Sequence, residues 1–163
     1  MSPLRLVGAA LIFLCAMATV REYSAFCKRR IAEGEAFASL LRHLKERVCV
    51  YLLPLSSAVA DFDDGELSRI GFIGALRSCG SLHSAFALVR DRLLISDGQK
   101  ELLSSFFADF GGAYVKDERE RIERAEDTLL KLQAEDEKKT VESEKVTKTL
   151  ILASALGLII LIL

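Results

Sequence analysis

The sequence predicts an all-α protein: a helical bundle with a long charged helix, flanked by N- and C-terminal transmembrane helices. Strong helix formers dominate the composition, whereas tryptophan is absent and proline occurs only at positions 3 and 54. Two stretches are too apolar around their whole circumference for a soluble core. At 163 residues, the remaining chain suffices for about one domain.

The charge balance excludes partners that would be attracted by a large net charge of the whole chain. The chain has 22 basic and 23 acidic residues, which gives a formal net charge of -1. Acidic and basic residues also alternate along 117–148, so no basic surface for nucleic acid is expected there. We therefore predict no nucleic-acid partner.

The first transmembrane helix is predicted at residues 4–20. No charged residue occurs from Leu6 to Val20, and Leu4 extends the run if the Arg5 guanidinium reaches the headgroups. Fifteen helical residues cover roughly 22 Å, against a hydrocarbon core of about 30 Å, so flanking residues must contribute to the span.

A cleaved signal peptide is the alternative interpretation of this segment. Arg5, a short apolar run and Ala16-Met17-Ala18 together imitate a basic n-region followed by a cleavage site. In that case the chain is an exported, C-terminally anchored helical interaction domain. The basic residue Arg21 and the basic cluster beyond it oppose export, so an uncleaved anchor is preferred.

The second transmembrane helix is predicted at 149–163, where the sequence reads TLILASALGLIILIL. Basic residues concentrate on the flanks that face the middle of the chain, which by the positive-inside rule directs the body to the cytoplasm. We therefore expect a cell-membrane protein with two spans and a cytoplasmic body. The flanking basic residues are Arg21, Lys28, Arg29, Arg30, Lys145 and Lys148.

Residues 21–116 are predicted to form the bundle. Apolar residues at helical spacing indicate helices at 35–51, 66–79 and 82–95, and a further helix through Leu102 to Phe110, separated by turns at 61–65, Gly80-Ser81 and Asp97-Gly98. Residues 117–148 then form a long charged helix, which either completes the bundle or forms a stalk. Its narrow apolar seam consists of Ile122, Ala125, Leu129 and Leu132.

No sequence pattern indicates an enzyme, a cofactor or a metal site. The acids at 61–66 lack the spacing of a calcium loop, so they are predicted to form a solvated turn with helix-capping acids. His43 and His83 are isolated, and no phosphate-binding glycine motif occurs. The four cysteines have no metal-binding spacing, and we expect buried free thiols, with a disulfide left open.

Three elements, in this order, resemble the stage III sporulation protein AB family of endospore-forming bacteria over nearly the whole chain. Arg21-Glu22-Tyr23 is similar to the family's Arg-x-x-Tyr flank, and Tyr51-Leu52-Leu53-Pro54-Leu55 to its Tyr-x-x-Pro-Leu element. The segment 110–118, FGGAYVKDE, stands where the family has Phe-Gly-x-x-Leu-Gly-x-Ser-Asp before a long charged helix. Substitutions at 114, 115, 117 and 118 indicate a divergent member.

The resemblance implies a mother-cell membrane protein of a sporulation secretion-like complex, with a body similar to the cytoplasmic helical domain of type II secretion F proteins. By this analogy it is a non-catalytic scaffold or adaptor between a secretion-type ATPase and the membrane components of a channel. A second copy of the chain is a further expected partner. The residues that the resemblance puts forward as partner contacts are Tyr51, Pro54, Leu55, Phe110, Gly111, Asp117 and Glu118.

Overall fold

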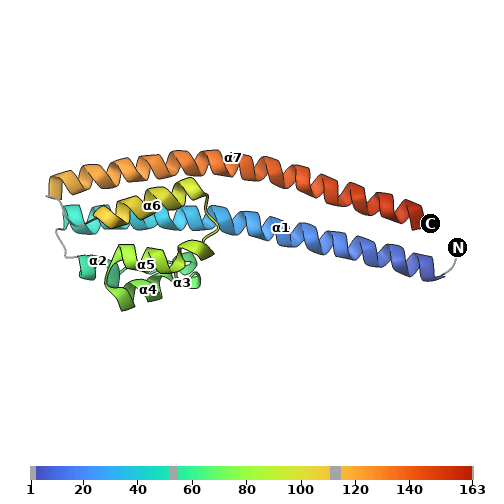
Figure 1. Cartoon of the computed structure of the whole chain (residues 1–163), viewed down its shortest axis with the longest axis horizontal. Coiled ribbons are helices and arrows are strands. Elements are labelled where there is room, and N and C mark those ends of the chain that lie inside the picture. The colour runs from blue at the N-terminus through green and yellow to red at the C-terminus, as the bar shows by residue number, and fades with distance from the viewer. Residues whose placement is uncertain (1–2, 52–54, 111–114, 163) are drawn as a thin grey trace. The chain divides into compact units, whose positions relative to one another are not determined.

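The computed structural model describes residues 3–51, 55–110 and 115–162, with side chains except at positions 3–6, 49, 55, 56, 60, 115, 116 and 162. These residues form helices and connecting turns without a strand, which confirms the all-α prediction (Figure 1). In chain order the elements are α1 (Pro3–Leu44), the π-helix η1 (Lys45–Val50), α2 (Leu55–Ala60), α3 (Gly65–Arg69), α4 (Phe72–Cys79), α5 (Leu82–Val89), the 3-10 helix η2 (Arg90–Arg92), α6 (Asp97–Asp109) and α7 (Val115–Ile162).

The chain divides into two compact units. The first, called the anchor unit here, comprises Met1–Arg29 and Glu137–Leu163, and the second, called the body, comprises Arg30–Asp136. The helices α1 and α7 each contribute to both units, whereas α2 to α6 belong to the body alone. The boundaries between the units lie between residues 29 and 30 and between residues 136 and 137. Neither boundary coincides with the end of an apolar segment of the sequence.

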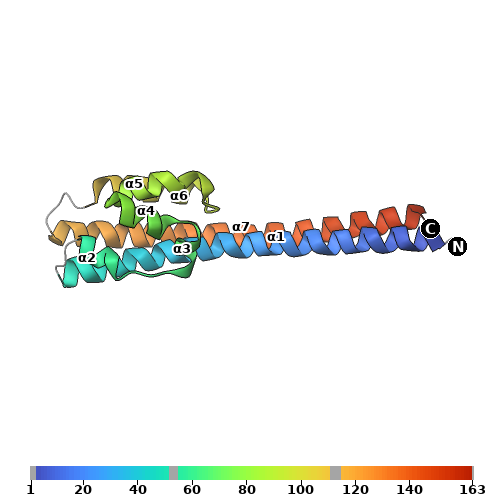
Figure 2. The ribbon, with the colours of Figure 1, turned by 90° about the horizontal axis from the view of Figure 1, so that it is seen from below.

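In the anchor unit, α1 and α7 run antiparallel and side by side (Figures 1 and 2). The Tyr23 hydroxyl lies 3.2 Å from the Ser143 hydroxyl, and Ser24 donates a hydrogen bond of 2.5 Å to Glu144. Small residues face the partner helix nearer the other end of the unit, where Ala16 and Ala155 are buried. Small side chains at such positions allow two helix backbones to approach closely.

The body has a core built around one face of α1. Phe37, Leu40, Leu41 and Leu44 are fully buried, as the predicted apolar stripe requires. The ring of Phe37 makes edge contacts with two further aromatic rings, at centroid distances of 5.5 Å to Phe72 and 5.8 Å to Phe86. The helix that carries this stripe does not begin at residue 35, as the sequence suggested, because α1 is continuous from Pro3.

The seam of α7 completes this core. Ile122, Ala125 and Leu129 are buried within the same hydrophobic cluster as the α1 stripe, and Leu132 is half-buried. The helix then continues without interruption to Ile162, as its lack of proline and glycine predicts. One charged helix thus packs in the body over its first part and in the anchor unit over its second.

The predicted single helix over 66–79 is wrong, because Gly71 interrupts it. This residue has φ 86°, in the left-handed region that favours glycine, and it separates α3 from α4. Gly80 has φ 65° and ends α4, and Ser81 caps α5 as predicted, its hydroxyl accepting the amide of Ser84 at 3.5 Å.

The boundaries between α5 and α6 also differ from the prediction. The helix expected to reach residue 95 ends at Val89, and Asp97-Gly98 is the first turn of α6 instead of a turn between helices. A capping box explains the early start: the Gln99 side-chain oxygen accepts the Ser96 amide at 3.0 Å while Ser96 caps the helix. This Ser-x-x-Gln pattern was present in the sequence.

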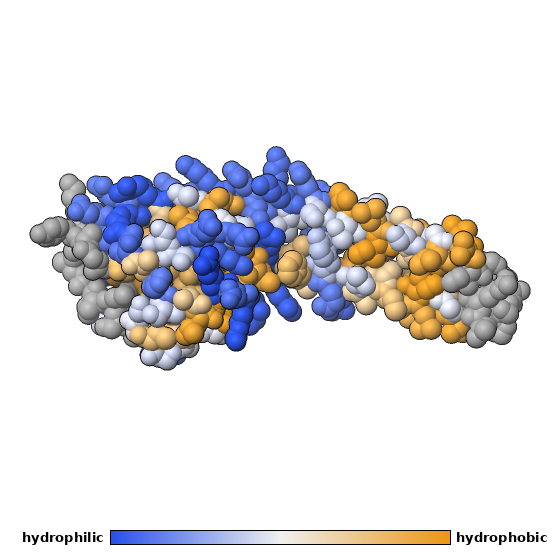
Figure 3. All heavy atoms as spheres, in the orientation of Figure 1, coloured by the Kyte–Doolittle hydropathy of each residue, from blue (hydrophilic) through white to orange (hydrophobic). Residues whose placement is uncertain are grey.

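Among the described residues, one helical stretch, Val7–Val48, is long and apolar enough to cross a membrane, and only 11% of its most apolar window is buried. The prediction of a membrane-compatible first segment is therefore confirmed in length and composition. In the view of Figure 3, apolar residues cover the part of the anchor unit next to its grey end. Residues 149–162 of the second predicted span form the end of α7, and the span itself stays a prediction.

We expect Phe37→Ala to lower the free energy of unfolding of the body by about 3 to 5 kcal/mol, because the cavity it leaves adjoins two aromatic rings. Urea titration of the detergent-solubilised full chain, followed by far-ultraviolet circular dichroism, measures the change. The matched control is Leu88→Ala, whose side chain is 64% exposed, and it changes the value by less than about 0.5 kcal/mol. Equal effects of the two substitutions would contradict this core.

Candidate functional site

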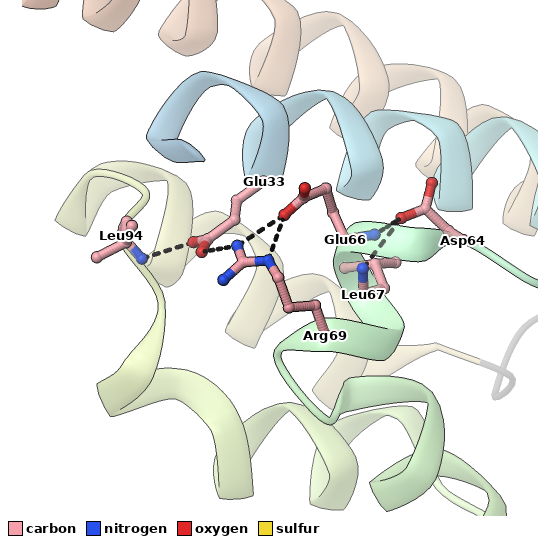
Figure 4. A network of polar contacts seen from close by, with 6 residues as sticks. All are labelled: Glu33, Asp64, Glu66, Leu67, Arg69 and Leu94. Carbon is pink, nitrogen blue, oxygen red and sulfur yellow. Dashed lines mark hydrogen bonds and ion pairs between the residues drawn. The ribbon is translucent and has the colours of Figure 1, made fainter. Parts of the chain in front are cut away.

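A buried carboxylate joins three segments of the body (Figure 4). Glu33 of α1 is 1% exposed, and one of its oxygens accepts the backbone N–H of Leu94 at 2.6 Å. The other oxygen lies 3.4 Å from the guanidinium of Arg69, at the end of α3. Glu33 thereby connects α1 to α3 and to the segment between α5 and α6.

The acidic turn before α3 positions Arg69. Asp64 caps α3 by accepting the amides of Glu66 and Leu67 at 2.9 and 3.0 Å, which confirms the predicted helix-capping role of the turn. Glu66 then accepts two hydrogen bonds from the Arg69 guanidinium, at 2.6 and 2.8 Å. The guanidinium is held in place for Glu33 by a second acid.

The sequence analysis missed Glu33. Glu33 lies four positions before Phe37, so it is a charged residue on the same face of α1 as the apolar stripe. An acid on the buried face of a helix is a signal for a partnered, buried carboxylate. Burial raises the pKa of Glu33, and the smaller opposing effects of the Leu94 N–H and of Arg69 do not cancel this increase.

Charged contacts also fix the register of α1 against α7 in the body. Glu126 accepts hydrogen bonds from Arg42 at 2.9 Å and from Lys45 at 3.0 Å. Partial burial acts to raise the pKa of Glu126, but these two cations lower it by more, so the net shift is downward. Arg30 forms a bidentate ion pair with Asp136, which lies further along the same two helices.

This antiparallel register brings the family-motif candidates to one end of the body, where α1, α6 and α7 have adjacent termini (Figure 1). Tyr51 is 58% exposed, with the Arg47 guanidinium 5.8 Å from its ring centroid. Phe110 is half-buried, and its ring lies 5.3 Å from that of Phe106. Asp117, in the first turn of α7, is exposed.

The remaining candidates contribute less to this surface. Glu118 is buried, and its carboxylate lies 3.6 Å from Arg121, so it is part of the local packing of α7. Leu55 begins α2, but its side chain lies outside the described residues. Pro54 and Gly111 lie outside the described residues altogether.

An irregular helix accompanies the exposed residues at this end. Lys45–Val50 form a π-helix, in which the Tyr51 amide donates to the carbonyl of Glu46 at 3.2 Å. Such wide turns occur frequently at functional sites because they displace side chains from the regular helical face. Here Val50, 61% exposed, and Tyr51 face solvent. We call Arg47, Val50 and Tyr51 the Tyr51 surface.

The basic residues predicted to flank the membrane fall into two groups. Arg30 and Lys148 are occupied by ion pairs, with Asp136 and with Glu144 respectively. The others are exposed and form no ion pair with any residue that the structure describes. This second group consists of Arg21, Lys28, Arg29 and Lys145.

The histidines and cysteines whose side chains the structure describes lie apart from one another or in structural contacts. The Nε2 atom of His43 lies 2.8 Å from the Ala58 carbonyl oxygen, so His43 joins α1 to α2, and His83 is exposed. Of the three cysteines whose side chains the structure describes, Cys27 is buried, whereas Cys15 and Cys79 are exposed, so the expectation of buried thiols is wrong for Cys15 and Cys79. The side chain of Cys49 lies outside the described residues. Among the described residues, no group of three or more His, Cys, Asp or Glu could hold a metal ion.

No family model, curated protein or solved structure matches the chain. The resemblance to the stage III sporulation protein AB family stays a prediction that rests on the motifs at 21–23, 51–55 and 110–118.

We expect Glu33→Gln to remove a component of the pH dependence of stability. A carboxyl whose pKa is raised on folding binds its proton more tightly in the folded state than in the unfolded state. Its contribution to the free energy of unfolding is therefore largest below the unfolded pKa of 4.5, and it declines as pH rises through the folded pKa. The glutamine oxygen can still accept the Leu94 N–H, but it has no charge to desolvate.

Urea titrations from about pH 4 to about pH 8 test this. Relative to the wild-type chain, Glu33→Gln becomes progressively more stable as pH rises. The matched control is Glu35→Gln, at an exposed position two residues away, which leaves the profile unchanged. A stability difference between Glu33→Gln and the wild-type chain that is constant across this pH range would rule out the proposed titration.

Proposed function

We propose that this protein is a membrane-anchored, non-catalytic scaffold or adaptor of a sporulation secretion-like channel complex. Two transmembrane helices hold it in the cell membrane of the mother cell. The helical body lies in the cytoplasm and couples a secretion-type ATPase to membrane components of the channel. The observation that carries the proposal is an anchor unit with exposed apolar side chains on both of its helices, joined by continuous helices to a body with its own core.

The exposed apolar side chains of the anchor unit support two spans. Large apolar residues of a water-soluble unit are mostly buried, and extended exposed patches indicate a membrane or a partner. On α1, Leu11 and Leu14 are 56% and 63% exposed; on α7, Leu150 and Ile160 are 61% and 75% exposed. A lipid bilayer would cover the exposed apolar side chains of both helices.

The polar groups of the anchor unit support the orientation. Tyr23 lies a few residues beyond the first apolar run and contacts Ser143, a few residues before the second, as expected for an aromatic residue at the interface between membrane and water. The basic residues occupy the same flanks. By the positive-inside rule, these flanks and the body face the cytoplasm.

The α1–α7 contacts also weigh against the exported alternative. Cleavage after Ala18 would remove Ala16, which is buried in the anchor unit opposite the segment that contains Ala155. It would leave the second span without the helix against which it packs. An uncleaved first helix is therefore the better account of the anchor unit.

The adaptor role rests on the family resemblance together with the Tyr51 surface. Tyrosine and arginine are enriched at the centres of protein interfaces, and this surface contains the exposed Tyr51 and the half-buried Arg47. A body that presents one such surface, and is fixed to the membrane elsewhere, has the organisation that an adaptor requires.

Labelling of Cys79 tests the topology. This thiol is exposed on the body, and it lies in the tryptic peptide 78–90, which contains no other cysteine. With the body in the cytoplasm, an impermeant maleimide leaves Cys79 unmodified in intact cells and modifies it after permeabilisation. Modification in intact, sealed cells would exclude a cytoplasmic body, and a mature chain that begins at Thr19 would establish the exported alternative.

Substitution of Tyr51 tests the adaptor role. We expect the full chain, solubilised from membranes, to co-purify with a secretion-type ATPase, and Tyr51→Ala to weaken this association by roughly 30-fold, as for an interface hot spot. Leu88→Ala is the matched control, since it also truncates an exposed apolar side chain but lies on α5. Equal retention of the ATPase by both variants would exclude the Tyr51 surface as its contact.

A further inference from the structure

The two units of the chain differ in charge. The anchor unit contains eight basic and four acidic residues, a formal charge of +4, whereas the body contains fourteen basic and nineteen acidic residues, a charge of -5. The two values add to the -1 of the whole chain. Near-neutrality of the complete sequence therefore conceals a positive anchor unit and a negative body.

The positive charge of the anchor unit is also less neutralised by neighbours. In the body, Arg30, Lys45 and Arg69 each form an ion pair with a largely buried carboxylate. In the anchor unit, six of the seven cations whose side chains the structure describes are exposed and make no ion pair with any described residue, against five of thirteen in the body. The charge of Lys28 nevertheless contributes to lowering the pKa of Glu144. We call the four of these six that lie nearest the apolar segments the basic collar: Arg21, Lys28, Arg29 and Lys145.

The collar is continuous with the apolar surface of the anchor unit. Arg21 directly follows Val20, and Lys145 precedes Thr149 by about 6 Å of helix. Lys28 and Arg29 follow Val20 by about 12 to 14 Å. The headgroup layer of a bilayer is about 5 to 8 Å thick, and charge acts over a further 8 to 10 Å or so at moderate salt. All four cations are thus within reach of lipid phosphates.

We infer that the basic collar binds the headgroups of anionic phospholipids. The inference rests on the membrane anchoring in the proposed function, and it adds the class of lipid. Guanidinium groups bind phosphate through paired hydrogen bonds, and lysine supplies a compact charge. Clusters of cations beside a membrane span attract anionic lipids in this way.

A membrane surface fits the collar better than an acidic protein does. The cations are divided between two helices, and all four lie within about 14 Å of the end of an apolar segment. Lipids surround a span on every exposed side, whereas a folded protein docks on one. Under the proposed function, the exposed apolar side chains next to the collar contact lipid as well.

The experiment uses the full chain in vesicles and electron spin resonance of spin-labelled phosphatidylglycerol or spin-labelled phosphatidylcholine. It measures the fraction of each lipid that is immobilised at the protein surface. We expect phosphatidylglycerol to associate about fivefold more strongly, the preference corresponding to one cation at the surface. Raising the salt to about 1 M, where the Debye length is near 3 Å, reduces this preference.

Two variants that lose the same number of positive charges show which cations cause the preference for phosphatidylglycerol. Arg21→Gln, Lys28→Gln, Arg29→Gln and Lys145→Gln, combined, bring the two lipids to nearly equal association. The control combines Arg77→Gln, Arg90→Gln, Arg92→Gln and Lys131→Gln, which are exposed cations of the body without ion pairs among the described residues, and it keeps the preference. Loss of the preference in both variants, or in neither, would overturn the collar as the lipid site.

Two further measurements separate the other outcomes. Replacement of chloride by inorganic phosphate at equal ionic strength leaves the lipid preference unchanged; its selective loss would assign the collar to free phosphate and overturn the lipid proposal. Flotation with neutral phosphatidylcholine vesicles after alkaline extraction reports anchoring itself. A chain that floats without preferring phosphatidylglycerol contradicts only the lipid inference, whereas one that fails to float contradicts the proposed function.

Discussion

The pairing of α1 with α7 is the interaction on which the rest of the body depends. The remaining helices of the body, α2 to α6, have thirteen residues or fewer. Isolated helices of that length are marginal in water, so they need a surface to pack against. The apolar stripe of α1 and the seam of α7 provide it, and Glu126, held between Arg42 and Lys45, sets the register in which the two long helices meet.

Glu33 adds a second constraint of a different kind. Apolar burial stabilises the body without specifying how each short helix is aligned, because apolar contacts are not directional. A buried carboxylate requires particular partners, here the Leu94 N–H and the Arg69 guanidinium. The network therefore restricts the placement of α3 and of the segment that leads into α6, at the cost of desolvating a charge.

The same two long helices bury different kinds of side chain in the two units. In the body their inward faces are apolar, and ion pairs flank the contact; in the anchor unit, small residues are buried and large apolar residues are exposed. This inversion is consistent with the proposed two spans, because lipid removes the penalty for exposing leucine and isoleucine. The uneven charge of the two units follows the same division, with exposed cations beside the apolar surface and acidic residues in excess on the body.

The sequence by itself determined the helical class, the apolar stripe through Phe37, the seam through Ile122 and the stop at Gly80, since each depends on spacing along one helix or on the conformational freedom of one residue. It did not show that Gly71 divides one expected helix in two, because a glycine within an apolar pattern is tolerated until packing demands a sharp turn. Only the tertiary structure brought Glu33 to Arg69 and Leu94, and Tyr51 to the end of the body where α7 begins. Those contacts join residues far apart in the chain, so they depend on how the helices pack against one another and not on either sequence segment alone.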